Sequence, residues 1–276
     1  MRRRLGGPVS ELAFEVRDIA YRYNQVPALR GLSIDIRKGE RVALLGANGC
    51  GKSTLLRLLA GLHFPESGEI RHFGDPLTER RLNEAEFFYG FRRRVGIIFQ
   101  NPDVQLFNPT VFDEVAFGPL QLRWPKQEIR ARVYDTLAMM GIENLVDRSP
   151  HRLSGGEKKR VAIASVLVVD PEILLLDEPS AALDPSSQSM VTDFLIRWGG
   201  GSKTVVTATH DLDTLEDVAD RCYVLENGTV AGEGTPLAVL HDVELLERTR
   251  LVRPHHHVHE PGTAQPSPHP HLHQHS

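Results

Sequence analysis

Apolar and polar residues alternate along the first part of the chain, between residues 11 and 36. The apolar members of this pattern are Leu12, Phe14, Val16, Ile19, Leu32, Ile34 and Ile36. A two-residue period is typical of strands that bury one face. The pattern therefore predicts short antiparallel strands over this region.

Other elements follow from longer apolar runs and from spacing. Five short runs predict buried strands: residues 41–45, 95–99, 173–176, 204–207 and 222–225. Leucines clustered within residues 52–62 predict a helix, and apolar residues at helical spacing predict a mainly helical region over residues 101–165. Asn227-Gly228 between apolar flanks predicts a hairpin turn. Strands interspersed with helices indicate an α/β fold with a mixed central sheet.

Composition narrows the classes of protein to which this chain can belong. The chain has 276 residues, of which 41% are hydrophobic and 25% charged, enough for a full α/β core. A net charge of −4 argues against a broad nucleic-acid-binding surface. Two cysteines make no disulfide framework, so we expect a reducing, cytoplasmic setting. We expect a flexible lead at 1–10, one domain at 11–245 and a tail at 246–276.

The sequence also bears on membranes. The basic start, Met1 to Arg4, is not followed by an apolar run, so it indicates a flexible lead rather than a signal peptide. The longest apolar runs, residues 161–169 and 173–176, are far shorter than the roughly 20 residues that span a bilayer. If the protein serves a membrane process, we expect another chain to cross the bilayer.

A phosphate-binding loop follows the predicted strand at 41–45. The pattern G-x-x-x-x-G-K-[ST] is carried by Gly46, Asn48, Gly49, Cys50, Gly51, Lys52, Ser53 and Thr54, with a helix predicted after it. In such a loop backbone N–H groups point at phosphate oxygens beside the positive end of the helix. Lys52 would reach the β- and γ-phosphates and Ser53 would bind Mg²⁺. The alternative is a glycine-rich turn followed by Lys-Ser by chance.

Acidic residues stand at the end of the apolar run 173–176. A buried carboxylate at Asp177 is costly unless it is paired, and a water-bridged Mg²⁺ would explain it. Glu178 is the candidate to accept a proton from an attacking water, the alternative being an ion pair with a nearby base. His210 follows the run 204–207, at a sheet edge where ligands collect, which favours a γ-phosphate contact over a structural role.

A second glycine-bearing segment precedes these acids. Ser154 and Glu157 form a capping-box pattern, which by itself only starts a helix. That pattern does not explain Gly155 and Gly156, because each weakens a helix by about 1 kcal/mol relative to alanine. Glycines at a helix start leave backbone N–H groups open to an anion. We therefore interpret both glycines as selected for contact with a ligand.

In this order the motifs resemble those of the ATP-binding subunit of ABC transporters, over about residues 11–245 with a helical subdomain at about 101–165. The resemblance implies ATP and Mg²⁺ as ligands, and a head-to-tail dimer, homomeric or with a sister ATPase. Each ATP would lie between one copy's phosphate loop and the partner's Ser154, Gly155 and Gly156. By position Tyr23 would stack on adenine, with Tyr21 as the alternative. Gln100 would sense Mg²⁺ and the water while linking to the helical region, and Asp184 would bridge the copies.

The segments 100–107 and 110–119 resemble the energy-coupling-factor branch of ABC importers. That branch implies a peripheral ATPase on the cytoplasmic membrane face, held by an integral membrane subunit and importing cobalt or nickel, or alternatively vitamins. Phe107, Phe112 and Phe117 would line the groove for that subunit, or else pack in the core. Cys50 stands where serine is commoner and is expected to be a small packed side chain rather than a redox group.

The last part of the chain is rich in histidine and proline, and we expect it to be disordered from residue 254. Imidazoles can bind Ni²⁺ or Co²⁺ loosely, so the tail is either a transition-metal buffer or inert. A soluble ABC ATPase of DNA repair or of the ribosome is the alternative class. It predicts coiled coils, zinc modules or two phosphate loops, and the sequence carries none of these.

Overall fold

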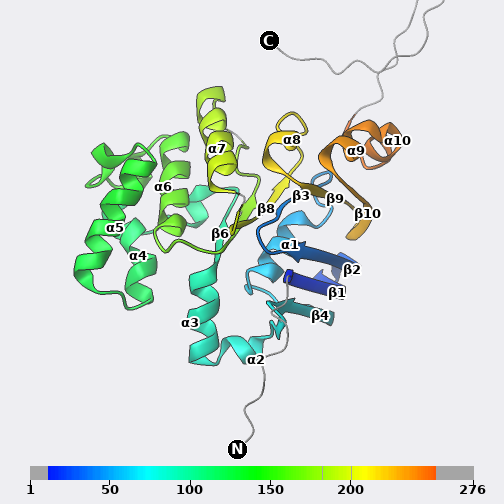
Figure 1. Ribbon diagram of the computed structural model, residues 1–276, viewed down its shortest axis with the longest axis horizontal. Coiled ribbons are helices and arrows are strands. Elements are labelled where there is room, and N and C mark those ends of the chain that lie inside the picture. The colour runs from blue at the N-terminus through cyan, green and yellow to red at the C-terminus, as the bar shows by residue number, and fades with distance from the viewer. Residues whose placement is uncertain (1–11, 182, 200, 253–276) are drawn as a thin grey trace, which may run out of the picture.

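The computed structural model describes residues 12–181, 183–199 and 201–252, and the predicted lead and histidine-rich tail lie outside them. An antiparallel sheet of order β2-β1-β4-β5 forms the N-terminal part (Figure 1). Its strands are β1 (Leu12–Tyr23), β2 (Val26–Arg37), β4 (Ser67–His72) and β5 (Asp75–Pro76). The alternating apolar residues of β1 and β2 face the main core, which is why the two-residue period is visible in the sequence.

A six-stranded sheet of order β10-β9-β3-β8-β7-β6 lies at the centre of the molecule. Its strands are β3 (Arg41–Leu45), β6 (Val95–Ile98), β7 (Ile173–Asp177), β8 (Thr204–Thr209), β9 (Arg221–Glu226) and β10 (Thr229–Gly234). β3 pairs in parallel with β8 and β9, β7 pairs in parallel with β6 and β8, and β10 is antiparallel to β9. The carboxyl ends of β3, β7 and β8 therefore meet at one edge, where α/β proteins bind ligands.

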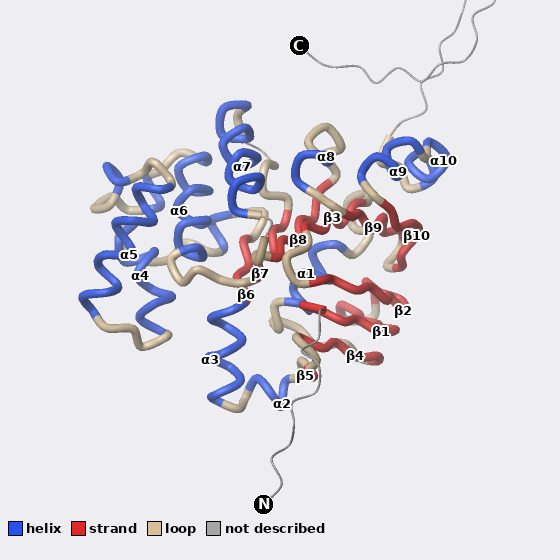
Figure 2. The backbone as a smooth tube through the Cα atoms, in the orientation of Figure 1, coloured by secondary structure: helices blue, strands red, loops and turns tan. Residues whose placement is uncertain are grey.

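Helices lie on both sides of the central sheet, and a separate helical layer lies at one side of the molecule (Figure 2). α1 (Lys52–Leu59) buries its leucines in the core between the two sheets. α2 (Glu79–Leu82) and α3 (Ala85–Arg94) connect β5 to β6. The helical layer is built from α4 (Val111–Gln121), α5 (Lys126–Met139) and α6 (Gly155–Leu167), which share a second core with one face of the central sheet. The remaining helices are α7 (Pro185–Trp198), α8 (Leu215–Val218), α9 (Pro236–His241) and α10 (Val243–Arg248).

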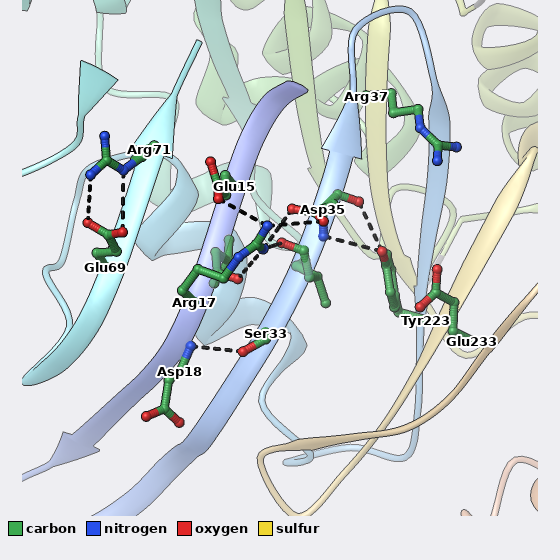
Figure 3. Close-up of polar contacts among 12 residues, drawn as sticks. Glu15, Arg17, Asp18, Ser33, Asp35, Arg37, Glu69, Arg71, Tyr223 and Glu233 are labelled. Atoms are coloured by element: carbon green, nitrogen blue, oxygen red, sulfur yellow. Dashed lines mark hydrogen bonds and ion pairs between the residues drawn. The ribbon is translucent and has the colours of Figure 1, made fainter. Parts of the chain in front are cut away.

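Polar contacts join the antiparallel sheet to the central sheet (Figure 3). The Tyr223 hydroxyl on β9 donates to the Asp35 carbonyl of β2 at 3.0 Å. The Asp35 carboxylate in turn accepts from Arg17 of β1 at 2.7 Å. Because β9 neighbours β3, these contacts fix β1 and β2 relative to the loop that follows β3.

The predicted strands and hairpin are confirmed, and the differences have local causes. The helix predicted over 52–62 ends at Leu59, because Gly61 adopts a left-handed φ of 61°. The hairpin between β9 and β10 has positive φ at both Asn227 and Gly228. Helix α10 continues past residue 245, and Leu246 is buried, so packed structure extends into the predicted tail. No helix among the described residues is long and apolar enough for a membrane span.

Candidate nucleotide-binding site

The phosphate loop runs from the end of β3 into the first turn of α1. Gly51 caps α1 with a φ of 114°, and a Cβ there would lie 2.9 Å from the Ala28 carbonyl. Only glycine fits this conformation and this close approach. The first turn of α1 carries no acidic residue, so the positive end of the helix is available to an anion. Lys52 folds back over the loop, where its Nζ donates to the Gly46 carbonyl at 2.5 Å.

Ser53 and Asp177 bring two oxygen atoms together at the end of α1 and β7. The Ser53 hydroxyl donates to Asp177 Oδ1 at 2.8 Å, and Asp177 is only 5% exposed. Burial raises the pKa of the Asp177 carboxyl, and the Ser53 hydrogen bond opposes that rise. A hydroxyl beside a carboxylate is an oxygen donor set of the kind that Mg²⁺ prefers. These two residues therefore fit a magnesium ion.

Glu178 follows Asp177 and is held by two basic side chains. The Glu178 backbone has a φ of 45°, in the left-handed region that residues other than glycine seldom adopt. Glu178 Oε1 lies 3.6 Å from Lys52 Nζ, within ion-pair range but too far for a hydrogen bond, and it accepts none. Oε2 lies 2.9 Å from His210 Nδ1. The structure thus brings Lys52, Glu178 and His210 together, from three different elements.

An open pocket of about 290 Å³ lies over the phosphate loop. It is lined by Tyr23, Val26, Pro27, Ala28, Asn48, Gly49, Gly51, Lys52, Ser53, Thr54, Gln100 and Glu178. Tyr23 is 37% exposed here, whereas Tyr21 packs against the core. The Tyr23 hydroxyl accepts from Arg57 of α1 at 3.1 Å. Of the two tyrosines, Tyr23 is thus the one that borders the pocket.

Cys50 and Gly46 lie close together in the phosphate loop. Cys50 is 8% exposed, and burial raises the pKa of its thiol. A Cβ at Gly46 would lie 2.6 Å from the Cys50 Sγ. The thiol is thus a small packed side chain, as the sequence analysis favoured.

The second surface lies at the start of α6. Ser154 and Glu157 form the predicted capping box, in which Ser154 N donates to Glu157 Oε2 at 2.8 Å. Nothing lies within 4 Å of a Cβ built on Gly155. The residues 154–156 and Asp184 do not line the pocket over the phosphate loop of the same chain.

Gly156, unlike Gly155, packs closely against another part of the same chain. A Cβ at Gly156 would lie 2.5 Å from Ser187 Oγ in the first turn of α7. Ser187 is fixed by Asp184, whose carboxylate caps α7 by accepting from Ser187 Oγ at 2.7 Å and from Ser187 N at 3.1 Å. Those bonds lower the pKa of Asp184. The interpretation of Gly156 as selected for ligand contact alone was therefore incomplete, because helix packing also requires it.

Two side chains that the sequence analysis did not name, Lys159 and Gln105, link residues 99–100 to α6, in line with the expected link from Gln100 to the helical region. Lys159 is 2% exposed, and its Nζ donates to the carbonyls of Phe99 at 3.0 Å and Gln100 at 3.3 Å. Gln105 accepts from Phe99 N at 3.3 Å and donates to the Ala162 carbonyl of α6 at 2.9 Å. A lysine on the apolar side of a helix is the signal that could have indicated Lys159.

The three phenylalanines of the helical region separate into two kinds. Phe107 is 61% exposed and Phe117 is 37% exposed, and their rings meet edge to face with centroids 5.0 Å apart. Phe112 packs against the core of the helical layer instead. Phe107 and Phe117 thus form an exposed aromatic pair.

Comparison with known proteins accounts for this arrangement. Residues 29–181 match the model of the ABC transporter family. A nickel import ATP-binding protein, NikO of Rhodobacter capsulatus, is 55% identical over 245 residues, covering 87% of this chain and 96% of that protein. The chain belongs to the ABC transporter family. It is an ATP-binding subunit that couples ATP hydrolysis to transport.

Other ABC proteins agree with this assignment. An energy-coupling factor transporter ATP-binding protein, EcfA of Methanothermobacter thermautotrophicus, is 44% identical over 241 residues, covering 87% of this chain and 76% of that protein. The structure of CbiO1 from Clostridium perfringens, part of the transporter complex CbiONQ, has a TM-score of 0.73 at 38% identity, covering 88% of this chain and 96% of that one. A dimeric ATP-binding cassette with ADP and Pi has a TM-score of 0.72 at 28% identity, covering 81% of this chain and 98% of that one.

Proposed function

We propose that this chain is the ATPase of an energy-coupling-factor importer for nickel or cobalt ions, and that it works as a head-to-tail dimer with a second copy or a sister subunit. The observation that carries the proposal is the 55% identity to a nickel import ATP-binding protein over 96% of that protein's length. The similarity to CbiO1 and to EcfA supports the energy-coupling-factor assignment.

In the proposed reaction Tyr23 stacks on adenine and the loop from Gly46 to Thr54 holds the phosphates. Lys52 and His210 stabilise charge on the γ-phosphate. Glu178 accepts a proton from the attacking water, and the contacts of both basic residues with its carboxylate support this assignment. Gln100, which lines the same pocket, orients the water.

Magnesium would be held by Ser53 and Asp177, with Gln100 beside them. The 2.8 Å separation of the Ser53 and Asp177 oxygens supports this placement. When bound, Mg²⁺ neutralises charge that develops on the phosphate oxygens. Asp177 then keeps its buried carboxylate ionised, despite the burial that raises its pKa.

The partner copy would supply Ser154, Gly155, Gly156 and Asp184 to the ATP. Two features support this assignment: these residues lie away from their own chain's pocket, and Gly155 leaves the start of α6 open. Backbone N–H groups at that helix start would bind the γ-phosphate. ATP then joins two chains, and its hydrolysis lets them separate.

The exposed pair Phe107 and Phe117 is the proposed contact for a helix of the integral membrane subunit. An aromatic pair at the surface of the helical layer is suited to hold an apolar helix face. Phe112, which packs in the core, is not part of this contact. The chain would therefore sit on the cytoplasmic face of the membrane as a peripheral subunit.

The test combines oligomeric state with transport. Glu178→Gln should retain ATP and form dimers in size-exclusion chromatography with ATP and Mg²⁺, whereas Lys52→Ala should stay monomeric. A Glu178→Gln protein that binds ATP yet remains monomeric with its membrane partner present would contradict the shared site. Uptake of radioactive Ni²⁺ or Co²⁺ by cells with the intact transporter, lost in Glu178→Gln, tests the cargo. Uptake of a vitamin instead would refute metal import.

The histidine-rich tail is a separable part of the proposal and lies outside the described residues. Its imidazoles would buffer Ni²⁺ or Co²⁺ near the transporter. Deleting residues 254–276 should leave ATP hydrolysis unchanged and reduce Ni²⁺ binding in calorimetry. Unchanged Ni²⁺ binding would remove the tail from the proposal and leave the ATPase assignment as it stands.

A further inference from the structure

Lys159 is a buried ionisable residue to which the nucleotide chemistry above gives no role. It lies in the second turn of α6, five residues after Ser154, and is 2% exposed. Burial lowers the pKa of its ammonium group to about 8, and the nearby Asp177 carboxylate partly offsets that effect. A lysine placed inside a protein at this cost needs polar partners.

Those partners are backbone carbonyls just beyond the end of β6. Pairing of β6 with β7 ends at Ile98, which is opposite Leu176. The next two carbonyls, of Phe99 and Gln100, accept from Lys159 Nζ at 3.0 and 3.3 Å. Lysine suits this task because an ammonium group donates several hydrogen bonds from one point.

The contact joins the two parts of the ATP machinery that lie on different layers. Gln100 borders the pocket over the phosphate loop, whereas α6 begins with the glycines of the second surface. Gln105 makes a parallel link, from Phe99 N to the Ala162 carbonyl of α6. Residues 99 and 100 are therefore joined to α6 by two side chains, Lys159 and Gln105.

We propose that Lys159 is a positioning residue that fixes Gln100 to α6, so that Gln100 and the Ser154–Gly156 surface move together as one unit when the ATP site closes. The inference rests on the proposed function, because it assumes that Gln100 serves the ATP on its own chain's phosphate loop and that the Ser154–Gly156 surface serves the partner's ATP. Lys159 itself does not line the pocket over the phosphate loop. Its loss should disturb the closed, reacting site and leave the first encounter with ATP unchanged.

The test compares Lys159→Met with Lys158→Met in the full-length chain. Lys158 is the matched control, because it is the adjacent lysine of α6 and pairs with Asp103 at the surface, at 2.7 Å. Exposed pairs of this kind contribute little. Steady-state ATP hydrolysis gives kcat and KM, and titration with a fluorescent ATP analogue gives Kd.

We expect kcat to fall about tenfold or more in Lys159→Met, since small misplacements of catalytic groups are costly, with KM and Kd within about twofold of wild type. Lys158→Met should match wild type in all three. A Lys159→Met protein with wild-type kcat, or one whose kcat loss is matched by an equal rise in Kd, overturns the proposal.

If Lys159→Met does not fold, as judged by circular dichroism, Lys159→Gln carries the test. Its shorter amide keeps a donor, so kcat should fall about threefold or more at unchanged KM, and a wild-type kcat overturns the proposal. A wild-type chain without any ATPase activity would count against the proposed function itself. Failure of the Lys159 proposal alone would appear as an active wild type whose kcat the Lys159 variants share.

Discussion

Glu178→Gln should raise the affinity of the open site for ATP, in addition to stopping hydrolysis. Lys52 and His210, both proposed to contact the γ-phosphate, are held by the Glu178 carboxylate in the structure. ATP has to displace that carboxylate before either side chain can bind phosphate. Removing its negative charge frees Lys52 and also removes a repulsion between the carboxylate and the incoming phosphate.

The size of this effect follows from the contact geometry. A hydrogen bond to a charged group contributes about 1.5–3 kcal/mol. The Lys52–Glu178 separation of 3.6 Å exceeds hydrogen-bond distance, although both side chains are buried, so the lower end applies. About 1.5 kcal/mol corresponds to an ATP Kd about tenfold lower in Glu178→Gln. Turnover should fall by about a hundredfold to ten-thousandfold with the loss of the general base.

The assay is fluorescence titration with an ATP analogue, with EDTA present and at low protein concentration, so that neither hydrolysis nor dimer formation contributes. Glu216→Gln is the charge-matched control, because Glu216 lies exposed on α8 and outside the pocket. Its Kd should equal that of wild type. A Kd in Glu178→Gln that is unchanged or higher would refute the reasoning that carboxylate and phosphate compete for Lys52.

Three further predictions follow from the structure. Lys52→Ala should weaken ATP binding by about tenfold to a hundredfold in the same titration, because a charge-assisted contact with phosphate is lost. Gly155→Ala should unfold in urea like wild type or slightly later, whereas Gly156→Ala should lose about 1 kcal/mol, because its Cβ would displace Ser187 from the Asp184 cap. Burial lowers the pKa of His72 to about 4, so the unfolded chain binds a proton first as pH falls. Stability should therefore drop by about 3 kcal/mol between pH 6.5 and pH 4, and urea denaturation of His72→Phe should lack that part of the loss.

An element can be predicted from the sequence where its own residues form an apolar run or a periodic pattern. β3, β6, β7 and β9 are short apolar runs, and they are found where predicted. No prediction was made for several elements, among them the strand β4 and the helices α2, α3 and α7. β4 alternates weakly, since its first three residues are all exposed. α3 carries aromatic and arginine residues whose partners lie elsewhere: Arg93 lies 6.0 Å from the ring of Trp124, and Arg123 lies 5.6 Å from that of Tyr89. Contacts of this kind depend on the tertiary fold and leave no local pattern.

The same division applies to the site. The phosphate loop has a fixed spacing, because a strand, a turn and a helix must follow one another within a few residues, so its members could be predicted one by one. The contact between Glu178 and His210 could not, because it depends on how β7 and β8 lie side by side. The place of Gly156 against α7 likewise depends on packing between two helices distant in sequence.

The positions of the site residues also constrain how the ATP site can close. Asp177, Glu178 and His210 lie at the ends of β7 and β8 or directly after them, and Lys52 begins α1 after β3; the three strands are hydrogen-bonded to one another in the central sheet. Gln100 and the start of α6 are tied instead to each other, through Lys159 and Gln105. Under the proposal for Lys159, closure of the site moves the second group relative to the first. Substitutions within either group should change rates of chemistry, whereas substitutions at the contact between the groups should change how the site opens and closes.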